Sequence, residues 1–587
     1  MKNILISVFL ILSISYFEPA YAEVSIWCVG DCEKIAPYDK SEKKNLFWDG
    51  DENVVKIYGA RNEYVSFQVI IKALNESLSG VTVLADEFRG KDAGIIEASN
   101  IDLFKEHYLK VTVPSSFDGK PVDEAQIGVY PTQMIPFRSG RKTIMPFKIE
   151  KDQNQPIWVD IYIPEDAVAG EYESVFTIVS DGKEPVKVRV ILTVWDFMLP
   201  HETHFRTYIY YGSEQLRWAF GYNDSGYPEF RALEDKFFQM AHQHRLVLCP
   251  NLEMEWGYDK FEKYWSERGR GPYIDGSAYT KRVGKKTPVN TWVIQIDDFD
   301  HEPEYQRLGK EALRFFAEKN VPDILMLYVY DEPCSKKNYD FIRERCDWVH
   351  KALGKKLPCM VTVPIKPPER SWGSLVGYVD IWNSGDSVLQ DVRARQKAGD
   401  KIWTYNMGWG GGPYVDTSGL AGRTHAWMGW KFDIEGWMFW DSCYWIDTHS
   451  LRDKNGNKIS GGEINKNPAQ YSTNVWKDPM TYDQMRRPGY RESDAMRLNG
   501  DGVLFYPGEY IGLQEPISSF IMKSLRRGLQ DYEYMWLARS MGKEKEVASI
   551  VDSVIIAPKK WNKDVNAWYT ARMELAKVIL SASKGAK

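Results

Sequence analysis

The sequence predicts a multidomain fold: an N-terminal β-sandwich followed by a (β/α)8 TIM barrel with a helical C-terminal extension. Three observations lead to it. The chain has 587 residues, which is too long for one ordinary domain. Up to about residue 200 it shows short strand-like runs separated by turn residues. Beyond that point, about eight β-rich runs alternate with helical segments, and eight strands are what close a TIM barrel.

Residues 1–22 have the pattern of a secretory signal peptide. Lys2 gives a short cationic start, residues 4–14 form an apolar run, and residues 20–22 supply the small residues that a signal peptidase recognises. We therefore predict cleavage after Ala22 and a secreted or periplasmic protein. The apolar run is too short for a spanning helix, and no later stretch is long and apolar enough to predict a membrane span.

The sandwich is expected over residues 23–200. Residues 157–163 alternate in polarity and stop at Pro164, after which residues 169–172 turn the chain into another strand. The last strand-like run, residues 186–194, leads into the segment 195–200, where we place the domain boundary.

The barrel is expected over residues 201–515, and a helical segment packed on it over residues 516–587. The eight barrel strands are predicted at residues 206–211, 246–252, 292–297, 324–330, 357–363, 378–382, 401–405 and 436–440. Apolar residues recur at helical spacing in residues 230–244, 305–319 and 339–353. The run 502–506 is a second candidate for the eighth strand.

The charge balance argues against a nucleic-acid partner. There are 75 Lys and Arg against 81 Asp and Glu, a formal charge of −6, so the basic surplus typical of nucleic-acid-binding domains is missing. Aromatic residues make up 14% of the chain, with 22 Trp and 34 Tyr. Such rings pack cores, but their flat faces also suit sugar rings.

Cofactor and metal motifs are missing from the sequence. It contains no His-Glu-x-x-His, no zinc-type Cys-His spacing and no Gly-x-Ser-x-Gly elbow. We therefore expect no metal and no cofactor. The seven cysteines are too few and too scattered for a disulfide framework, and a local bridge between Cys28 and Cys32 is left open.

The fourth expected barrel strand ends in two adjacent carboxylates, Asp331 and Glu332, followed by Pro333. In a TIM barrel the chemistry lies at the carboxyl ends of the strands. Two neighbouring acids repel each other, so one should resist ionisation, and a protonated acid beside an ionised partner is what glycoside hydrolysis requires. The alternative is a solvated strand-end pair without a chemical role. The position in the barrel favours Asp331 and Glu332 as catalytic residues.

The other strand ends offer Asn251, Glu253, Asp297, Asp298, Asn383, Tyr405, Asn406, Trp440 and Asp441. A retaining glycosidase with two carboxylates would place the second one near the end of the seventh strand, about 5–5.5 Å from the acid. That strand ends at Tyr405 and Asn406 instead. The gap points to a substrate that supplies its own nucleophile: the carbonyl oxygen of a 2-acetamido sugar attacks C1 while Asp331 holds the amide N–H and Glu332 protonates the leaving oxygen.

Five motifs carry a resemblance to a known family. They are residues 156–172 of the sandwich, its exit at 194–200, the strand end 330–333, and the late segments 500–508 and 526–534. On these motifs the sequence resembles family 123 of the glycoside hydrolases over nearly the whole mature chain. The resemblance implies a β-N-acetylgalactosaminidase that works by substrate-assisted retention. It also implies that Asp331 orients the acetamido group and that Glu332 is the general acid/base.

The expected sugar-binding residues are Tyr405, Asn383, Asn406, Trp440 and Asp441. Tyr405 is predicted to donate to the acetamido oxygen, Trp440 to offer a ring face, and the other three to bind sugar hydroxyls. Trp440 is chosen from seven tryptophans between residues 403 and 445, most of which should be core packing. The glycine-rich residues 408–413 are expected as a flexible loop over the barrel mouth.

The expected partner is a glycan with a terminal 2-acetamido sugar, with no nucleic acid involved. Two other interpretations stay open. The first is a glycosidase for another hexosaminide or a polysaccharide, in which a carboxylate such as Asp441 would have to lie near Glu332 as the nucleophile. The second is a carbohydrate-binding protein without catalysis, which would keep the aromatic residues but not need Glu332.

Overall fold

The computed structural model describes residues 23–91, 94–139, 142–222, 226, 228–249, 258–296, 301–385, 387–453, 456–471 and 473–585. The expected signal peptide lies outside these residues, as do Asn251, Glu253, Asp297 and Asp298. Within the described ranges, no helix combines the length and the apolar character needed to cross a bilayer.

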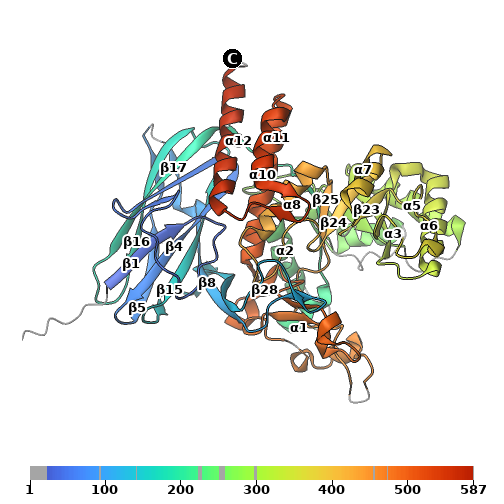
Figure 1. The fold of residues 1–587 in the computed structure, drawn as a ribbon, viewed down its shortest axis with the longest axis horizontal. Helices are drawn as coiled ribbons and strands as arrows, with labels where there is room; N and C mark the ends of the chain where they lie inside the picture. Colours follow the sequence, from blue (N-terminus) through green and yellow to red (C-terminus); the bar gives the residue numbers. More distant parts are fainter. Residues whose placement is uncertain are drawn as a thin grey trace, which may run out of the picture.

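The N-terminal part is a β-sandwich (Figure 1). One sheet has the spatial order β1 (Glu23–Val29), β4 (Glu63–Leu74), β15 (Asn154–Ile163), β8 (Ile101–Val111), β11 (Gly128–Pro136). The other has the order β14 (Phe147–Ile149), β5 (Leu78–Ala85), β16 (Gly170–Val179), β17 (Val186–Met198), β3 (Val54–Arg61), β2 (Trp48–Asp49), with β6 (Phe88–Gly90) and β7 (Ile95–Ile96) at the side. Alternate residues of each strand face the core between the sheets, where the rings of Phe67 and Phe176 lie 5.8 Å apart.

The second part contains an eight-stranded parallel sheet that curls into a barrel. In chain order its strands are β18 (Arg206–Tyr210), β19 (Leu248–Cys249), β20 (Trp292–Ile294), β21 (Leu325–Asp331), β22 (Cys359–Thr362), β23 (Ile381–Asn383), β24 (Lys401–Tyr405) and β25 (Gly436–Phe439). Each overlaps one of the eight expected segments. The barrel is nearly closed: β19 and β20 are the two edges of the sheet, with no strand pairing between them in the described residues. Across this gap the Val293 N–H donates to Cys249 Sγ at 3.5 Å.

The alternative eighth strand is wrong. Residues 505–507 form β28 (Phe505–Pro507), which pairs antiparallel with β29 (Pro516–Ser518) outside the barrel. The eighth position is taken by β25, which pairs with β24 on one side and with β18 on the other.

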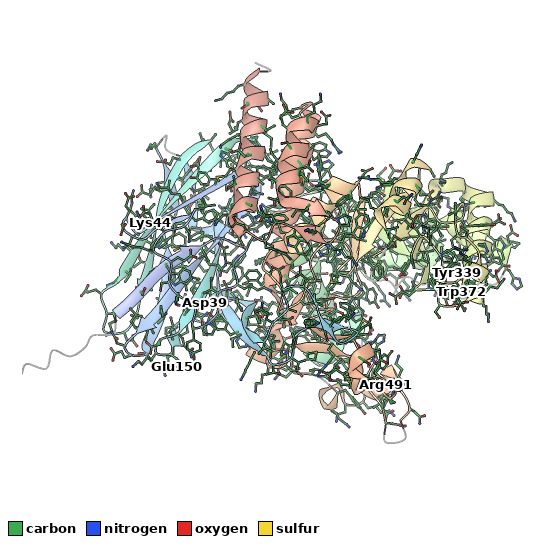
Figure 2. The ribbon with its side chains drawn as sticks, viewed as in Figure 1. Asp39, Lys44, Glu150, Tyr339, Trp372 and Arg491 are labelled. Carbon is green, nitrogen blue, oxygen red and sulfur yellow. The ribbon has the colours of Figure 1, made fainter. Side chains whose placement is uncertain are left out.

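Helices cover the barrel. The longer ones are α2 (Pro228–Gln243), α5 (Glu302–Glu318), α6 (Lys336–Leu353), α7 (Leu389–Lys397) and α8 (Ala421–Phe432), and the shorter ones are α1 (Ser213–Phe220), α3 (Tyr258–Glu262), α4 (Gly271–Ile274) and α9 (Gly461–Ile464). The side chain of Ser335 caps α6 by accepting from the Asn338 N–H at 3.2 Å. Figure 2 shows Tyr339 of α6 beside Trp372 from the segment after β22, with their ring centroids 5.3 Å apart.

Three C-terminal helices complete the fold: α10 (Phe520–Ser540), α11 (Glu544–Val554) and α12 (Val565–Gly585), with a hairpin of β30 (Ile555–Ala557) and β31 (Lys560–Trp561). In Figure 1, α10 and α12 lie between the sandwich and the barrel. Buried ion pairs join α10 and α12 to sandwich and barrel residues. We call this set the interdomain ion cluster; its members are Asp31, Glu63, Asp160, Arg423, Lys523, Arg526, Arg527, Asp531 and Arg572.

A hairpin of the sandwich part reaches the segment that follows the barrel. Strands β9 (Ser116–Phe117) and β10 (Lys120–Pro121) form one sheet with β26 (Met480–Asp483) and β27 (Arg497–Asn499); a separate hairpin pairs β12 (Arg138–Ser139) with β13 (Lys142–Thr143). Next to this sheet, Asp416 accepts hydrogen bonds from the Ser115 hydroxyl at 2.7 Å and from Asn499 Nδ2 at 3.2 Å. Residues from three distant parts of the chain are thereby held together.

The structure answers one question that the sequence left open, the Cys28–Cys32 bridge, and contradicts one expectation, the flexible glycine-rich loop. Cys28 and Cys32 are free thiols in different cores, Cys28 inside the sandwich and Cys32 beside Arg423, so they do not bridge. The glycine-rich residues 408–413 are buried and do not form a flexible loop. The Gly411 N–H donates to Thr424 of α8, and a Cβ at Gly410 would lie 2.6 Å from the His425 ring, so these glycines permit close packing against α8.

Candidate active site

The carboxylate pair lies at the carboxyl end of the fourth barrel strand. Asp331 is the last residue of β21, and Glu332 follows it with φ of +43°. This is the left-handed backbone region, which a residue with a side chain adopts at an energetic cost and which is found at functional sites. Both side chains are exposed, in contrast to the buried residues 325–329 of the same strand.

A β-bulge determines which side chains accompany Asp331. In the pairing of β21 with β22, Tyr328 is opposite Met360 and Tyr330 is opposite Val361, so Val329 is an extra residue. Strict alternation would send side chains three positions apart to opposite faces of the sheet. The bulge instead brings Tyr328 and Asp331 together, while the Tyr330 hydroxyl accepts from Asn338 of α6 on the outer side.

Two hydroxyl groups orient Asp331. Tyr328 donates to Asp331 Oδ1 at 2.6 Å, and Thr362, the last residue of β22, donates to the same oxygen at 2.5 Å. Burial and then the charge of Asp331 raise the pKa of the Tyr328 hydroxyl well above its usual value, so this group stays a donor. Both hydroxyls use Oδ1, and no hydrogen bond to the second carboxylate oxygen of Asp331 is recorded from the described residues.

Glu332 is held from two strands. Tyr405, the last residue of β24, donates its hydroxyl to Glu332 Oε1 at 3.0 Å. The Glu332 N–H donates to Thr362 Oγ1 at 3.0 Å, which fixes the unusual backbone at this position. The fourth, fifth and seventh strands of the barrel therefore converge on this pair.

Two further candidate residues, Asn406 and Trp440, come directly after the ends of β24 and β25. Asn406 follows Tyr405 with φ of +51°, and its Oδ1 accepts from the Trp440 N–H at 3.2 Å. The Trp440 indole donates to Asp501 Oδ2 at 3.1 Å. Burial raises the pKa of Asp501 to about 7. A series of contacts therefore runs from Glu332 to Trp440. Hydrogen bonds join Glu332 to Tyr405 and Asn406 to Trp440, and Tyr405 and Asn406 are neighbours in the sequence.

Trp440 belongs to a group of rings at the end of the eighth strand. Tyr444, Tyr482 and His449 have ring centroids 4.7, 5.9 and 6.2 Å from that of Trp440. The Trp440 side chain is half-buried. Such a group presents both a ring face and polar edges, which is the surface a sugar requires.

Asn383 and Asp441 are buried, and their recorded hydrogen bonds do not lead to the carboxylate pair. Asn383, at the end of β23, donates from Nδ2 to the Met438 sulfur at 2.9 Å, and its Oδ1 is buried without a hydrogen-bond partner. Asp441 Oδ1 accepts from the backbone N–H groups of Ser442 and Cys443, at 2.7 and 2.9 Å. Burial raises the pKa of Asp441 to about 8. Their predicted contacts with sugar hydroxyls stay predictions.

Most of the tryptophans near the last strands are core residues, as the sequence led us to expect. Trp403, Trp409, Trp427, Trp437 and Trp445 are at most 3% exposed, whereas Trp430 and Trp440 are half-buried. Sequence reasoning missed Tyr328, Thr362, Asp501 and Tyr482. Tyr328 lies three residues before Asp331, and the nearer hydroxyl in the sequence is that of Tyr330; the bulge that turns Tyr328 toward Asp331 has no local signal.

Two other features of the described residues lie away from the Asp331-Glu332 pair. One of about 280 Å³ lies between the sandwich and α2, with Tyr64, Asp160, His244 and Lys523 in its wall. At the opposite end of the barrel from Asp331, the side chains of His350, Cys359 and Asp380 lie together and are the described residues that could hold a metal ion.

The fold and the carboxylate pair together define a class: a (β/α)8-barrel protein with an acidic site at the carboxyl ends of its strands. Comparison of the sequence with models of protein families identifies the family. The glycoside hydrolase 123 N-terminal domain matches residues 36–180, and the glycoside hydrolase 123 catalytic domain matches residues 279–538. The chain belongs to the family 123-like glycoside hydrolases.

Solved structures agree on the fold. A family 123 glycoside hydrolase from Clostridium perfringens, described in a study of glycolipid glycan hydrolysis, aligns with a TM-score of 0.64 and 11% identity over 96% of this chain and 97% of that one. A Bacteroides ovatus GH5 xyloglucanase aligns with a TM-score of only 0.24 and 9% identity, over 70% of this chain and 97% of that one, and supports no argument. No curated protein matches the chain.

Proposed function

We propose that this glycoside hydrolase releases β-linked N-acetylgalactosamine from glycans by a retaining, substrate-assisted reaction. The observation that carries the proposal is the Asp331-Glu332 pair, in which each carboxylate accepts a hydrogen bond from a hydroxyl group of another barrel strand. An arrangement of this kind positions two acids for separate tasks.

Glu332 is the proposed general acid and base. It protonates the glycosidic oxygen as the bond to C1 breaks, and later takes a proton from the water that opens the intermediate. The Tyr405 hydroxyl donates to this carboxylate at 3.0 Å and holds it in place; the predicted hydrogen bond from Tyr405 to the acetamido oxygen stays a prediction. Because the side chain is exposed at the barrel mouth, it can reach a leaving group of variable size.

Asp331 is the proposed partner of the acetamido group. With Oδ1 occupied by Tyr328 and Thr362, Oδ2 accepts the amide N–H of the sugar. This raises the electron density on the amide carbonyl oxygen, which attacks C1 from the face opposite the leaving group and forms an oxazolinium ion. Water then opens this ring, and the configuration at C1 is retained.

The structure gives little support to Asp441 as an alternative nucleophile. A nucleophilic carboxylate must be ionised and must face C1. Asp441 is 5% exposed, its Oδ1 is used by two backbone N–H groups, and burial raises its pKa to about 8. These features favour a neutral acid that stabilises the turn after β25.

We also propose that the chain is secreted or periplasmic and loses residues 1–22. The support is the sequence pattern alone. N-terminal sequencing of the protein recovered from outside the cytoplasm should begin at Glu23. Recovery of an intact Met1 from the cytoplasm would overturn the proposal.

The central test compares three p-nitrophenyl β-glycosides, those of N-acetylgalactosamine, N-acetylglucosamine and galactose, with and without a thiazoline analogue of the N-acetyl sugar. We expect cleavage of the N-acetylgalactosamine compound, inhibition by the thiazoline, and no cleavage of the galactoside, which lacks the amide nucleophile. Proton NMR of the first product should show the β anomer.

Other outcomes would redirect the assignment. Preference for the N-acetylglucosamine compound would keep the mechanism but change the sugar. Cleavage of the galactoside would mean that the enzyme, and not the substrate, supplies the nucleophile. Binding of the sugars without cleavage of any compound would indicate a carbohydrate-binding protein.

A further inference from the structure

We propose that the amino-terminal end of the barrel holds a divalent transition-metal site for zinc, with His350, Cys359 and Asp380 as its protein ligands. The three residues come from different elements: His350 from the last turns of α6, Cys359 from the first position of β22, and Asp380 from the residue before β23. One ligand atom of each lies within 4.8 Å of the others. The site is separate from Asp331 and Glu332, which lie at the other end of the strands.

The distances suit a metal with small adjustments. His350 Nε2 lies 2.8 Å from Asp380 Oδ2. In a tetrahedral zinc site with Zn–N and Zn–O near 2.0–2.2 Å, two such atoms lie about 3.3 Å apart, so a shift of a few tenths of an ångström admits the ion. Imidazole nitrogen, thiolate sulfur and carboxylate oxygen are the ligand types that zinc takes in proteins.

The ligand charges also favour a cation. A thiolate at Cys359 and a carboxylate at Asp380 contribute two negative charges, and a neutral His350 contributes none. The exposed Lys355 ammonium lies 3.3 Å from Asp380 Oδ1 and pairs with that carboxylate, so the ion is needed mainly to balance the charge of the buried Cys359 thiolate. Binding requires that Cys359 lose its thiol proton and that His350 be unprotonated, so protons leave as the ion enters.

Neighbouring groups support the three ligands. Cys346 lies one helical turn before His350 on α6 and shares a hydrogen bond with the Cys359 thiol. The Cys359 N–H donates to Asp380 Oδ2 at 2.9 Å and so fixes the carboxylate. Such supporting partners orient metal ligands. Cys346, Cys359 and Asp380 are at most 5% exposed, while the His350 side chain is 21% exposed and offers the way in from solvent.

The site would have a structural role. It connects α6 directly to β22 and β23, and α6 is the helix that follows the catalytic strand β21. The amino-terminal face of a TIM barrel is the face on which side chains serve stability, whereas catalysis lies at the other end. The metal therefore holds α6, β22 and β23 together at the amino-terminal end of the barrel, opposite the Asp331-Glu332 pair.

The experiment uses the full mature chain, treated with a chelator, reduced and reloaded with Zn²⁺ or Co²⁺. Elemental mass spectrometry should give one metal ion per chain. The cobalt-loaded protein should show a thiolate-to-cobalt charge-transfer absorption band, and adding zinc should raise Tm. Cys359→Ser should abolish the cobalt band, and Cys359→Ser and His350→Gln should each weaken zinc binding at least about 100-fold. Cys334→Ser, which changes an exposed cysteine outside the site, should behave as the wild type.

Three results would overturn the proposal. One is the absence of stoichiometric metal in the reloaded chain. Another is zinc binding that is unchanged in the His350→Gln variant. This variant keeps the test possible even where Cys359→Ser fails to fold, because the His350 side chain is partly exposed and can be replaced. The third is a Cys346–Cys359 disulfide in the protein as isolated, detected by peptide mass spectrometry before reduction.

Discussion

The interdomain ion cluster and the barrel mouth hold their carboxylates in opposite ways. In the cluster, Asp160 is 2% exposed at its side chain and pairs with Lys523 at 2.7 Å and with Arg526. At the mouth, Asp331 and Glu332 are exposed and are held by the hydroxyl groups of Tyr328, Thr362 and Tyr405. Both regions gather acids, but the recorded partners are cations in the cluster and hydroxyl groups at the mouth.

This difference separates stability from chemistry. Burial alone would raise the pKa of Asp160, but Arg526 and Lys523 lower it well below its usual value, so this carboxylate stays ionised. Hydroxyl donors orient a carboxylate without a fixed charge beside it, and an acid that must both donate and accept a proton needs that freedom. The first region fastens the sandwich to α10, and the second orients the two acids that we propose for the reaction.

The largest expected effect is on catalysis at the mouth. Glu332→Gln removes the proposed proton donor and should lower kcat/KM for the p-nitrophenyl N-acetylgalactosamine substrate about 10²- to 10⁴-fold. Tm should stay close to that of the wild type, because the side chain is exposed. Glu344→Gln, an exposed carboxylate on α6, is the matched control. Full activity in Glu332→Gln would remove this residue from the reaction.

The next effect is on stability at the interdomain ion cluster. Asp160→Ala leaves Lys523 and Arg526 buried without their partner and should lower the free energy of unfolding by about 3–5 kcal/mol. Activity of the folded variant should change little. The control is Glu173→Ala, which breaks an exposed pair with Arg189 and should cost at most about 1 kcal/mol. Equal losses in the two variants, measured by denaturant unfolding, would contradict the contrast between the regions.

A smaller effect is expected from one hydroxyl at the mouth. Tyr405→Phe removes the hydrogen bond to Glu332 and should lower kcat about 10-fold, since a hydrogen bond to a charged group contributes about 1.5 kcal/mol or more. Tyr330→Phe is the control, because that hydroxyl lies with Asn338 on the outer side of the strand. A loss of the same size in both variants, in parallel kinetic assays, would show that the position of the hydroxyl is unimportant.

The smallest effect concerns pH. Burial raises the pKa of Asp441 to about 8, so the folded protein keeps a proton there that the unfolded chain loses near pH 4. Stability should therefore fall as the pH rises from about 4 to about 8. Asp441→Asn can keep the two backbone hydrogen bonds and removes this component, so its Tm relative to the wild type should rise with pH. Parallel Tm curves from pH 5 to pH 8 would contradict the raised pKa.

The sequence determined the parts of this protein that depend on local pattern. Polarity alternating every second residue predicted the sandwich strands, and β-rich runs spaced by helices predicted all eight barrel strands. The same reasoning put Asp331 and Glu332 at the end of the fourth one. These predictions succeeded because burial repeats with the period of the backbone and because a parallel barrel places all carboxyl ends on one face.

Which side chains meet at the site depends on how the whole fold packs. The bulge at Val329 turned Tyr328 toward Asp331, and the closing of the barrel brought Tyr405 to Glu332 across 73 positions of the chain. Asp160 and Lys523 are 363 positions apart. Such contacts have no sequence period, since they depend on how whole sheets and helices pack. Local sequence therefore placed the acids, and packing chose the side chains that hold them.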